Sequence, residues 1–160
     1  MIGIIADTHD NLYAINKAVD ILNKKKVDLV IHAGDLISPF TVKEFSRLKP
    51  KFLAVFGNND GERNGLKKAY EKLCFLEDFK EFNIENKRFC LLHGTNEAIV
   101  DALKKSKNYD VIIRGHTHRL NIQEEDTLVI NPGEVCGYVT GEKTLVLLDP
   151  KTFNYDVIQL

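Results

Sequence analysis

Residues with imidazole, carboxylate and amide side chains stand at the C-terminal ends of a series of apolar stretches along this chain. The stretches read "IIADTH", "VIHAGD", "AVFGNND", "CLLHGT" and "VIIRGHTH". These side-chain types are metal ligands in proteins, and seven of them exceed the needs of one tetrahedral site. They indicate two metal ions, with a carboxylate such as Asp35 between them. The candidate ligands are Asp7, His9, Asp35, Asn58, His93, His116 and His118.

These residues can act together only if the chain brings the ends of the apolar stretches to one place. Each stretch is typical of a buried strand, and the carboxyl ends of strands in an open α/β sheet converge on one crevice. Four of the five histidines fall at such ends, which scattered surface histidines would rarely do. Asp7 and His9, two apart in extended chain, would project to the same side and could hold one ion.

Helices are expected between the strands. Apolar residues spaced by three and four after "DTHDN" predict a helix that Asp10 or Asn11 caps and that ends in the basic run 24–26. Further helices are predicted in "VKEFSRL", "RNGLKKAYEKL" and "NEAIVDALKKS", and a hairpin in "EFNIENKRFCLLHG" with its turn near 85–87. The early alternation predicts a largely parallel sheet, and the short strands of the last third predict a second, more antiparallel sheet.

Length and composition exclude several classes of protein. The chain has 160 residues, which suits a single domain over 1–160. Its net charge of −1 gives no global attraction to nucleic acid, and no apolar run is long enough to span a membrane. The three cysteines form no C-x-x-C pair and the N-terminus does not resemble a signal peptide. We therefore expect a cytoplasmic protein with no membrane partner and no evident nucleic-acid-binding surface.

The ordered motifs together resemble those of a known family. Asp7-x-His9, Gly34-Asp35, Gly57-Asn58-Asn59-Asp60, His93-Gly94 and Gly115-His116-Thr117-His118 are similar to the motifs of the calcineurin-like metallophosphoesterase superfamily, across about residues 1–140. The length and the "INPGE" segment resemble its small single-domain phosphodiesterases of bacteria and archaea, which are related in fold to a retromer subunit. The resemblance implies an α/β fold in which two mixed β-sheets pack as a sandwich flanked by helices.

The resemblance also implies a site and an activity. The first ion would be held by Asp7, His9, Asp35 and His118, and the second by Asp35, Asn58, His93 and His116. The expected activity is hydrolysis of a small phosphodiester or nucleotide-type substrate by a hydroxide that bridges two divalent ions. Manganese or nickel is favoured, and iron, zinc and cobalt are alternatives. A non-catalytic scaffold for protein partners and a phosphomonoesterase are the competing functions, and a homodimer is compatible with the sequence.

The third motif departs from the family pattern. Asn59 stands where the superfamily commonly has a histidine that protonates the leaving group, and asparagine cannot act as a general acid near neutral pH. Modest turnover that favours good leaving groups is expected. Asn59 and Asp60 are the candidate catalytic residues, with Asp60 orienting its neighbours. Asn59 and Arg63 are the candidate substrate contacts.

Other residues near the motifs are expected to serve the fold. His32 is predicted to be a hydrogen-bonded core histidine, and Cys90 a small buried hydrophobe. Gly115 is expected to let the chain turn before the two histidines. Arg114 is expected to be solvated, with substrate phosphate as its alternative partner. The segment 131–133 is expected to form a tight turn near the site.

Overall fold

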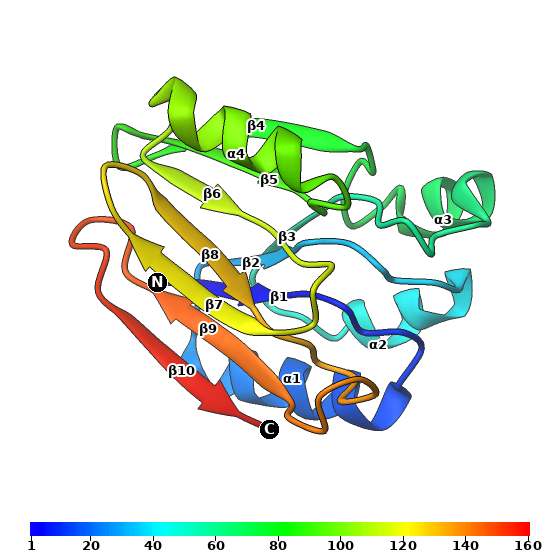
Figure 1. Cartoon of the computed structure of the whole chain (residues 1–160). Helices are drawn as coiled ribbons and strands as arrows, with labels where there is room; N and C mark the ends of the chain where they lie inside the picture. The colour runs from blue at the N-terminus through cyan, green and yellow to red at the C-terminus, as the bar shows by residue number, and fades with distance from the viewer.

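A computed structural model describes residues 1–160 as two stacked five-stranded sheets with helices on both outer sides (Figure 1). In the first sheet, β1, β2 and β3 are parallel, β9 pairs antiparallel with β1, and β10 pairs antiparallel with β9 at the edge. The strand order is β10-β9-β1-β2-β3. These strands are β1 (Ile2–Ile5), β2 (Leu29–His32), β3 (Lys51–Ala54), β9 (Thr144–Leu148) and β10 (Tyr155–Gln159).

The second sheet is also mixed. Its order is β4-β5-β6-β8-β7, with β5, β6 and β8 parallel and an antiparallel strand at each edge. Its strands are β4 (Phe79–Ile84), β5 (Lys87–Leu92), β6 (Val111–Ile113), β7 (Leu120–Glu124) and β8 (Leu128–Pro132). The parallel strands of both sheets deliver the polar residues that follow them to one edge of the molecule.

The helices cover the two outer faces of the sandwich (Figure 1). They are α1 (Leu12–Lys25), α2 (Val42–Phe45), α3 (Arg63–Tyr70) and α4 (Glu97–Ser106), and a 3₁₀ turn at Pro39–Thr41 precedes α2. The Asn11 side chain accepts a hydrogen bond from the Ala14 amide at 3.2 Å and caps α1. None of the helices has the length and apolar character needed to cross a membrane.

Alternation along the strands produces the layers of the core. In β5, Phe89 and Leu91 pack between the two sheets, whereas Cys90 and Leu92 face α4. Cys90 is fully buried, as predicted, and burial raises the pKa of its thiol to about 12. On the other outer face, α1 packs Ile15, Val19 and Leu22 against the first sheet. Both sheets are thereby buried on both faces over most of their area.

The sequence predictions for the fold are largely confirmed. The four helices, the hairpin and the fold of two mixed sheets occur as expected, and Glu85 and Asn86 form the hairpin turn at φ of 50° and 61°. The prediction of a separate antiparallel sheet in the last third is wrong. Strands β9 and β10 join the first sheet beside β1, and β6 and β8 form the parallel centre of the second. Strand β7 was not predicted.

Candidate metal centre

All seven candidate ligands lie near the carboxyl ends of the parallel strands. Asp7 and His9 follow β1, Asp35 follows β2 and Asn58 follows β3. In the second sheet, His93 follows β5, and His116 and His118 follow β6. Both sheets therefore supply ligand-type side chains to one centre, as the strand-end argument predicted.

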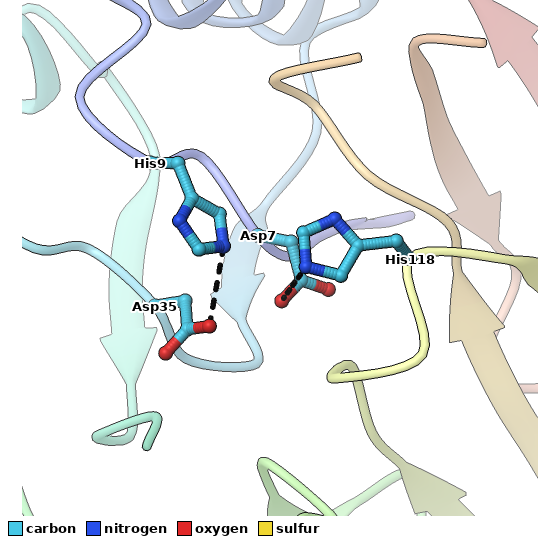
Figure 2. A group of neighbouring side chains, drawn as sticks. All are labelled: Asp7, His9, Asp35 and His118. Atoms are coloured by element: carbon cyan, nitrogen blue, oxygen red, sulfur yellow. Dashed lines mark ion pairs between the residues drawn. The ribbon is translucent and has the colours of Figure 1, made fainter. Parts of the chain in front are cut away.

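The first group contains two carboxylates and two imidazoles (Figure 2). One ligand atom from each of Asp7, His9, Asp35 and His118 lies within 4.8 Å of every other. His9 Nε2 is 3.2 Å from Asp35 Oδ2, and His118 Nε2 is 3.7 Å from Asp7 Oδ1. These distances leave a space between the side chains that suits one ion coordinated by nitrogen and oxygen.

The second group adjoins the first at Asp35. The side-chain oxygen of Asn58 is 2.9 Å from His93 Nε2 and 2.9 Å from His116 Nδ1. His93 Nε2 is also 3.4 Å from Asp35 Oδ2. Asp35 thus belongs to both groups.

The orientation of the rings tests whether these residues fit a cation. His93 Nδ1 lies 2.7 Å from the carbonyl oxygen of Ala33. A carbonyl only accepts, so Nδ1 carries the hydrogen, and in the neutral ring the Nε2 lone pair faces the oxygens of Asn58 and Asp35. Asp7 Oδ1 and His9 Nε2 are buried and have no hydrogen-bond partner. Converging lone pairs and orphaned buried acceptors are the arrangement that divalent ions would satisfy.

The carboxylates differ in electrostatic environment. Burial raises the pKa of Asp7 to about 6, against the lowering effect of His93 and His118. Burial also acts to raise the pKa of Asp35, but the neighbouring His9 and His93 rings and the hydrogen bonds from Asn59 outweigh it and hold this pKa well below the usual range. Asp35 is therefore the carboxylate that stays ionised most readily.

The backbone is unusual at the centre. Asp7, His9, Asp35, His116 and His118 adopt positive φ angles of 51°, 39°, 62°, 74° and 60°. Each such non-glycine residue costs of order 1–3 kcal/mol, and such residues cluster at functional sites. The expectation that Asp7 and His9 meet by alternation in an extended strand is therefore wrong, because β1 ends at Ile5 and two left-handed residues turn their side chains together.

Gly115 has a different role from the one expected. It has no positive φ, and the turn is made by His116 and His118 instead. A Cβ atom at Gly115 would lie 2.9 Å from Ala6 Cβ and 3.0 Å from Asp7 Oδ2. The glycine therefore permits the loop after β6 to approach the loop after β1.

A buried asparagine holds this loop in place. Asn131 was expected in a tight turn, but it lies in β8, and only Gly133 beyond the strand has a positive φ, of 80°. The Asn131 side-chain amide donates to Gly115 O at 2.8 Å and to Thr117 Oγ1 at 2.9 Å. It fixes the loop that carries His116 and His118.

Glu134 is the residue at the centre that sequence reasoning missed. It is fully buried, and its Oε2 accepts a hydrogen bond from His118 Nδ1 at 2.7 Å. The Cys136 thiol at 3.0 Å and the Thr140 amide at 2.6 Å also donate to it. Burial acts to raise the pKa of Glu134, but these hydrogen bonds lower it to about 2. Glu134 thus keeps the hydrogen of His118 on Nδ1 and turns Nε2 toward Asp7.

The two candidate catalytic residues, Asn59 and Asp60, both donate to or accept from the loops of the centre, and Asn59 is also exposed to solvent. Asn59 donates its backbone amide to Asp35 Oδ1 at 2.9 Å and its side-chain amide to Asp35 Oδ2 at 2.8 Å. Asp60 is buried and accepts from the amides of Ile37 at 2.6 Å and Gly57 at 2.7 Å. Asp60 therefore joins the loop after β2 to the loop after β3, which agrees with an orienting role.

The two arginines lie apart from the ligand groups. Arg63 pairs with Asp78 at 2.7 Å. The expectation for Arg114 is wrong: it is only 6% exposed and donates to Glu97 at 2.6 Å and to Gly94 O at 3.0 Å. A buried guanidinium with these partners ties α4 to the loop after β5.

His32 is a core residue, as predicted. It is fully buried, its Nδ1 accepts from the Gly34 amide at 3.1 Å, and its Nε2 lies 3.0 Å from Thr8 Oγ1. It supports the loop that carries Asp35 and stays outside the ligand groups.

The sequence model of the calcineurin-like phosphoesterase superfamily domain matches residues 1–152. The chain belongs to this superfamily. It is 44% identical to a phosphodiesterase of Methanocaldococcus jannaschii over 163 residues, which cover 99% of this chain and 98% of that one. It is also 37% identical to a probable metallophosphoesterase of Methanothermobacter thermautotrophicus over 170 residues, covering 99% of this chain and 92% of the relative.

Solved structures of superfamily members have the same fold. A structure described as a novel archaeal phosphodiesterase superimposes with a TM-score of 0.95 at 44% identity, over 99% of each chain. Vps29 of Chaetomium thermophilum superimposes with a TM-score of 0.72 at 19% identity, over 99% of this chain and 94% of that one. At this lower identity the likeness concerns the fold alone.

Proposed function

We propose that this chain is a metal-dependent phosphodiesterase that hydrolyses small phosphodiesters at a centre of two divalent ions. The observation that carries the proposal is the pair of ligand groups that share Asp35, with lone pairs directed at one another. The 44% identity to a protein named as a phosphodiesterase supports diesters as the substrate class.

The proposed ligands are divided between the two groups. Asp7, His9, Asp35 and His118 would hold one ion, and Asp35, Asn58, His93 and His116 would hold the other. Such ions, when bound, lower the pKa of coordinated water and stabilise charge on the phosphoryl oxygens. The mixed nitrogen and oxygen ligands suit manganese, iron, cobalt, nickel or zinc, and we favour manganese or nickel.

The protein's own groups set the preference for leaving groups. The Asn59 amide, which holds both oxygens of Asp35, has no proton that it can transfer near neutral pH. The departing alcohol must therefore leave without a proton from residue 59. Esters of acidic alcohols are expected to react fastest.

Features of the structure also support a proposed domain organisation and cellular compartment for the protein. Both sheets contribute ligands to one centre, which supports residues 1–160 as a single domain. The three cysteines are unpaired. Free thiols support a reducing compartment such as the cytoplasm.

The test compares two substrates after metal exchange. Chelator-treated protein is resupplied with each divalent metal in turn and assayed with bis(p-nitrophenyl) phosphate and p-nitrophenyl phosphate. We expect metal-restored cleavage of the diester that exceeds cleavage of the monoester and is lost in His116→Ala. Faster cleavage of the monoester would identify a phosphomonoesterase. Two bound ions without cleavage of either ester would identify a scaffold.

A further inference from the structure

A groove opens beside the second ligand group, between the N-terminal ends of α3 and α4, which lie apart in Figure 1. It has a volume of about 280 Å³, close to the lower end of the range of roughly 300–1,000 Å³ typical of small-ligand clefts. Asn58 and His93 of the second ligand group line it together with Arg63 and Asp78. A molecule bound at the metal centre would therefore extend directly into this groove.

The charges of the groove indicate what it does not bind. Arg63 is the one lysine or arginine that lines it. Its guanidinium lies 2.7 Å from Asp78 Oδ1 and 4.7 Å from the centre of the Phe56 ring. This positive charge is already matched, so a second phosphate group would meet the Asp78 carboxylate without an unpaired cation among the lining residues. Lys67 Nζ lies 5.7 Å from the centre of the Phe56 ring but does not line the groove. The charge pattern favours an uncharged occupant.

The walls of the groove offer apolar surface together with a hydrogen-bond donor. Ile99 projects from α4 and is 53% exposed, and Leu92 lines the groove at the end of β5. The Asn96 side-chain oxygen accepts from the Ala98 amide at 3.0 Å, which leaves its NH₂ group available. Apolar walls with a few polar groups are characteristic of sites for small organic molecules.

We propose that this groove binds one alcohol substituent of the phosphodiester, an uncharged group of nucleoside size that packs against Ile99 and accepts a hydrogen bond from Asn96. The proposal rests on the proposed function, because the metal centre would hold the phosphate beside Asn58 and His93 of the groove. The substrate class that follows is a nucleoside phosphodiester without a second phosphate on this side.

The test measures binding by calorimetry of manganese-loaded protein with two phosphate monoesters, thymidine 5′-phosphate and methyl phosphate. They carry the same charged group and differ in the nucleoside. We expect thymidine 5′-phosphate to bind about tenfold more tightly, the factor that burial of about 55 Å² of apolar surface supplies. In Ile99→Asn this ratio should fall toward one.

The matched control is Ala102→Asn, an equally polar change at an exposed position of the same helix that does not line the groove. It should keep the tenfold ratio. A ratio near one in the unchanged protein, or a tenfold ratio that survives in Ile99→Asn, would overturn the groove proposal.

Hydrolysis of bis(p-nitrophenyl) phosphate, measured in parallel, separates this proposal from the proposed function. If the protein hydrolyses the diester and the ratio of the two affinities is unaltered in Ile99→Asn, the groove proposal is overturned and the phosphodiesterase proposal stands. If the protein hydrolyses no diester and the affinity ratio falls to about one in Ile99→Asn, the groove is supported as a nucleotide-binding site and the phosphodiesterase proposal is overturned.

Discussion

Two histidines of the centre form hydrogen bonds to other protein groups through their Nδ1 atoms. His93 uses Nδ1 at the Ala33 carbonyl and His118 uses Nδ1 at Glu134, so both present Nε2 to the carboxylates. A neutral imidazole binds a metal through one nitrogen, and the partner of the other nitrogen decides which one that is. The Ala33 carbonyl and Glu134, which touch no proposed ion, therefore determine which nitrogen each histidine presents.

Removing Glu134 is predicted to weaken metal binding. Glu134→Ala frees His118 to rotate and to change tautomer, and loss of such a partner typically costs about 10–100-fold in metal affinity. Titration of manganese against a competing chelator measures the change. The manganese affinity of Glu134→Gln, which retains an acceptor for His118, should lie between those of the unchanged protein and Glu134→Ala. Unchanged affinity in a folded Glu134→Ala protein would show that the contact does not position His118.

Restoring a histidine in the third motif is predicted to change leaving-group dependence. Asn59→His supplies a group that can donate a proton near neutral pH, and general acids contribute roughly 10²–10⁴-fold. Activity on diesters of poor leaving groups should rise, with little change on p-nitrophenyl esters. The variant also loses the Asn59 hydrogen bond to Asp35 Oδ2, so metal content must be measured beside activity. Equal effects on both kinds of ester would contradict this account.

Among the secondary-structure elements, two helices are followed by a lysine in a strained, left-handed backbone conformation, away from the metal centre. Lys26 caps the C-terminus of helix α1 and Lys107 that of helix α4, each with φ of 55° in the left-handed region. A lysine there bears the clash of its Cβ atom, which glycine avoids. These two positions are strained although no ligand group lies beside them.

Lys26→Gly is predicted to stabilise the protein. Relief of the left-handed lysine should raise the free energy of unfolding by about 0.5–1 kcal/mol, as read from denaturant titration. Lys25→Gly, one position earlier in the last helical turn, is the matched control and should lower it by about 1 kcal/mol. If both variants were destabilised equally, the αL position would not be the source of strain.

The elements also show how far the sequence could predict the structure. Apolar spacing and the Asn11 cap were enough to locate α1, but β7 was missed because its residues are half-buried or exposed at a sheet edge. The pairing of β9 with β1 could not be predicted, since a short apolar strand carries no signal of its partner. Strand-end position correctly predicted which side chains lie close together, whereas Glu134 was missed because its burial depends on the loop folded around it.

At the scale of the whole molecule, the buried His32 makes stability depend on pH. Burial lowers the pKa of His32 to about 3, below its ordinary value of about 6.5. Above pH 6.5 the ring is neutral in both folded and unfolded chains. Below it the unfolded chain binds a proton that the folded one excludes, so stability is lost as the pH falls toward 3.

The predicted slope is measurable in metal-free protein. Between pH 6 and pH 4.5, His32 should contribute a loss of about 1.4 kcal/mol per pH unit in the free energy of unfolding. His32→Gln removes this titration and should have a shallower dependence over the same range. Denaturant titrations at several pH values measure both slopes, and identical slopes would show that His32 becomes protonated inside the fold.

The pairing of Ile2 with Leu148 places the first strand beside one of the last. On the ribosome, β1 emerges early and lacks this neighbour until the C-terminal part of the chain follows. The proposed ligands are spread in the same way, from Asp7 to His118, and Glu134 comes later still. A nascent chain therefore cannot bring all the proposed ligands together, or hold His118 through Glu134, before residue 134 has been made.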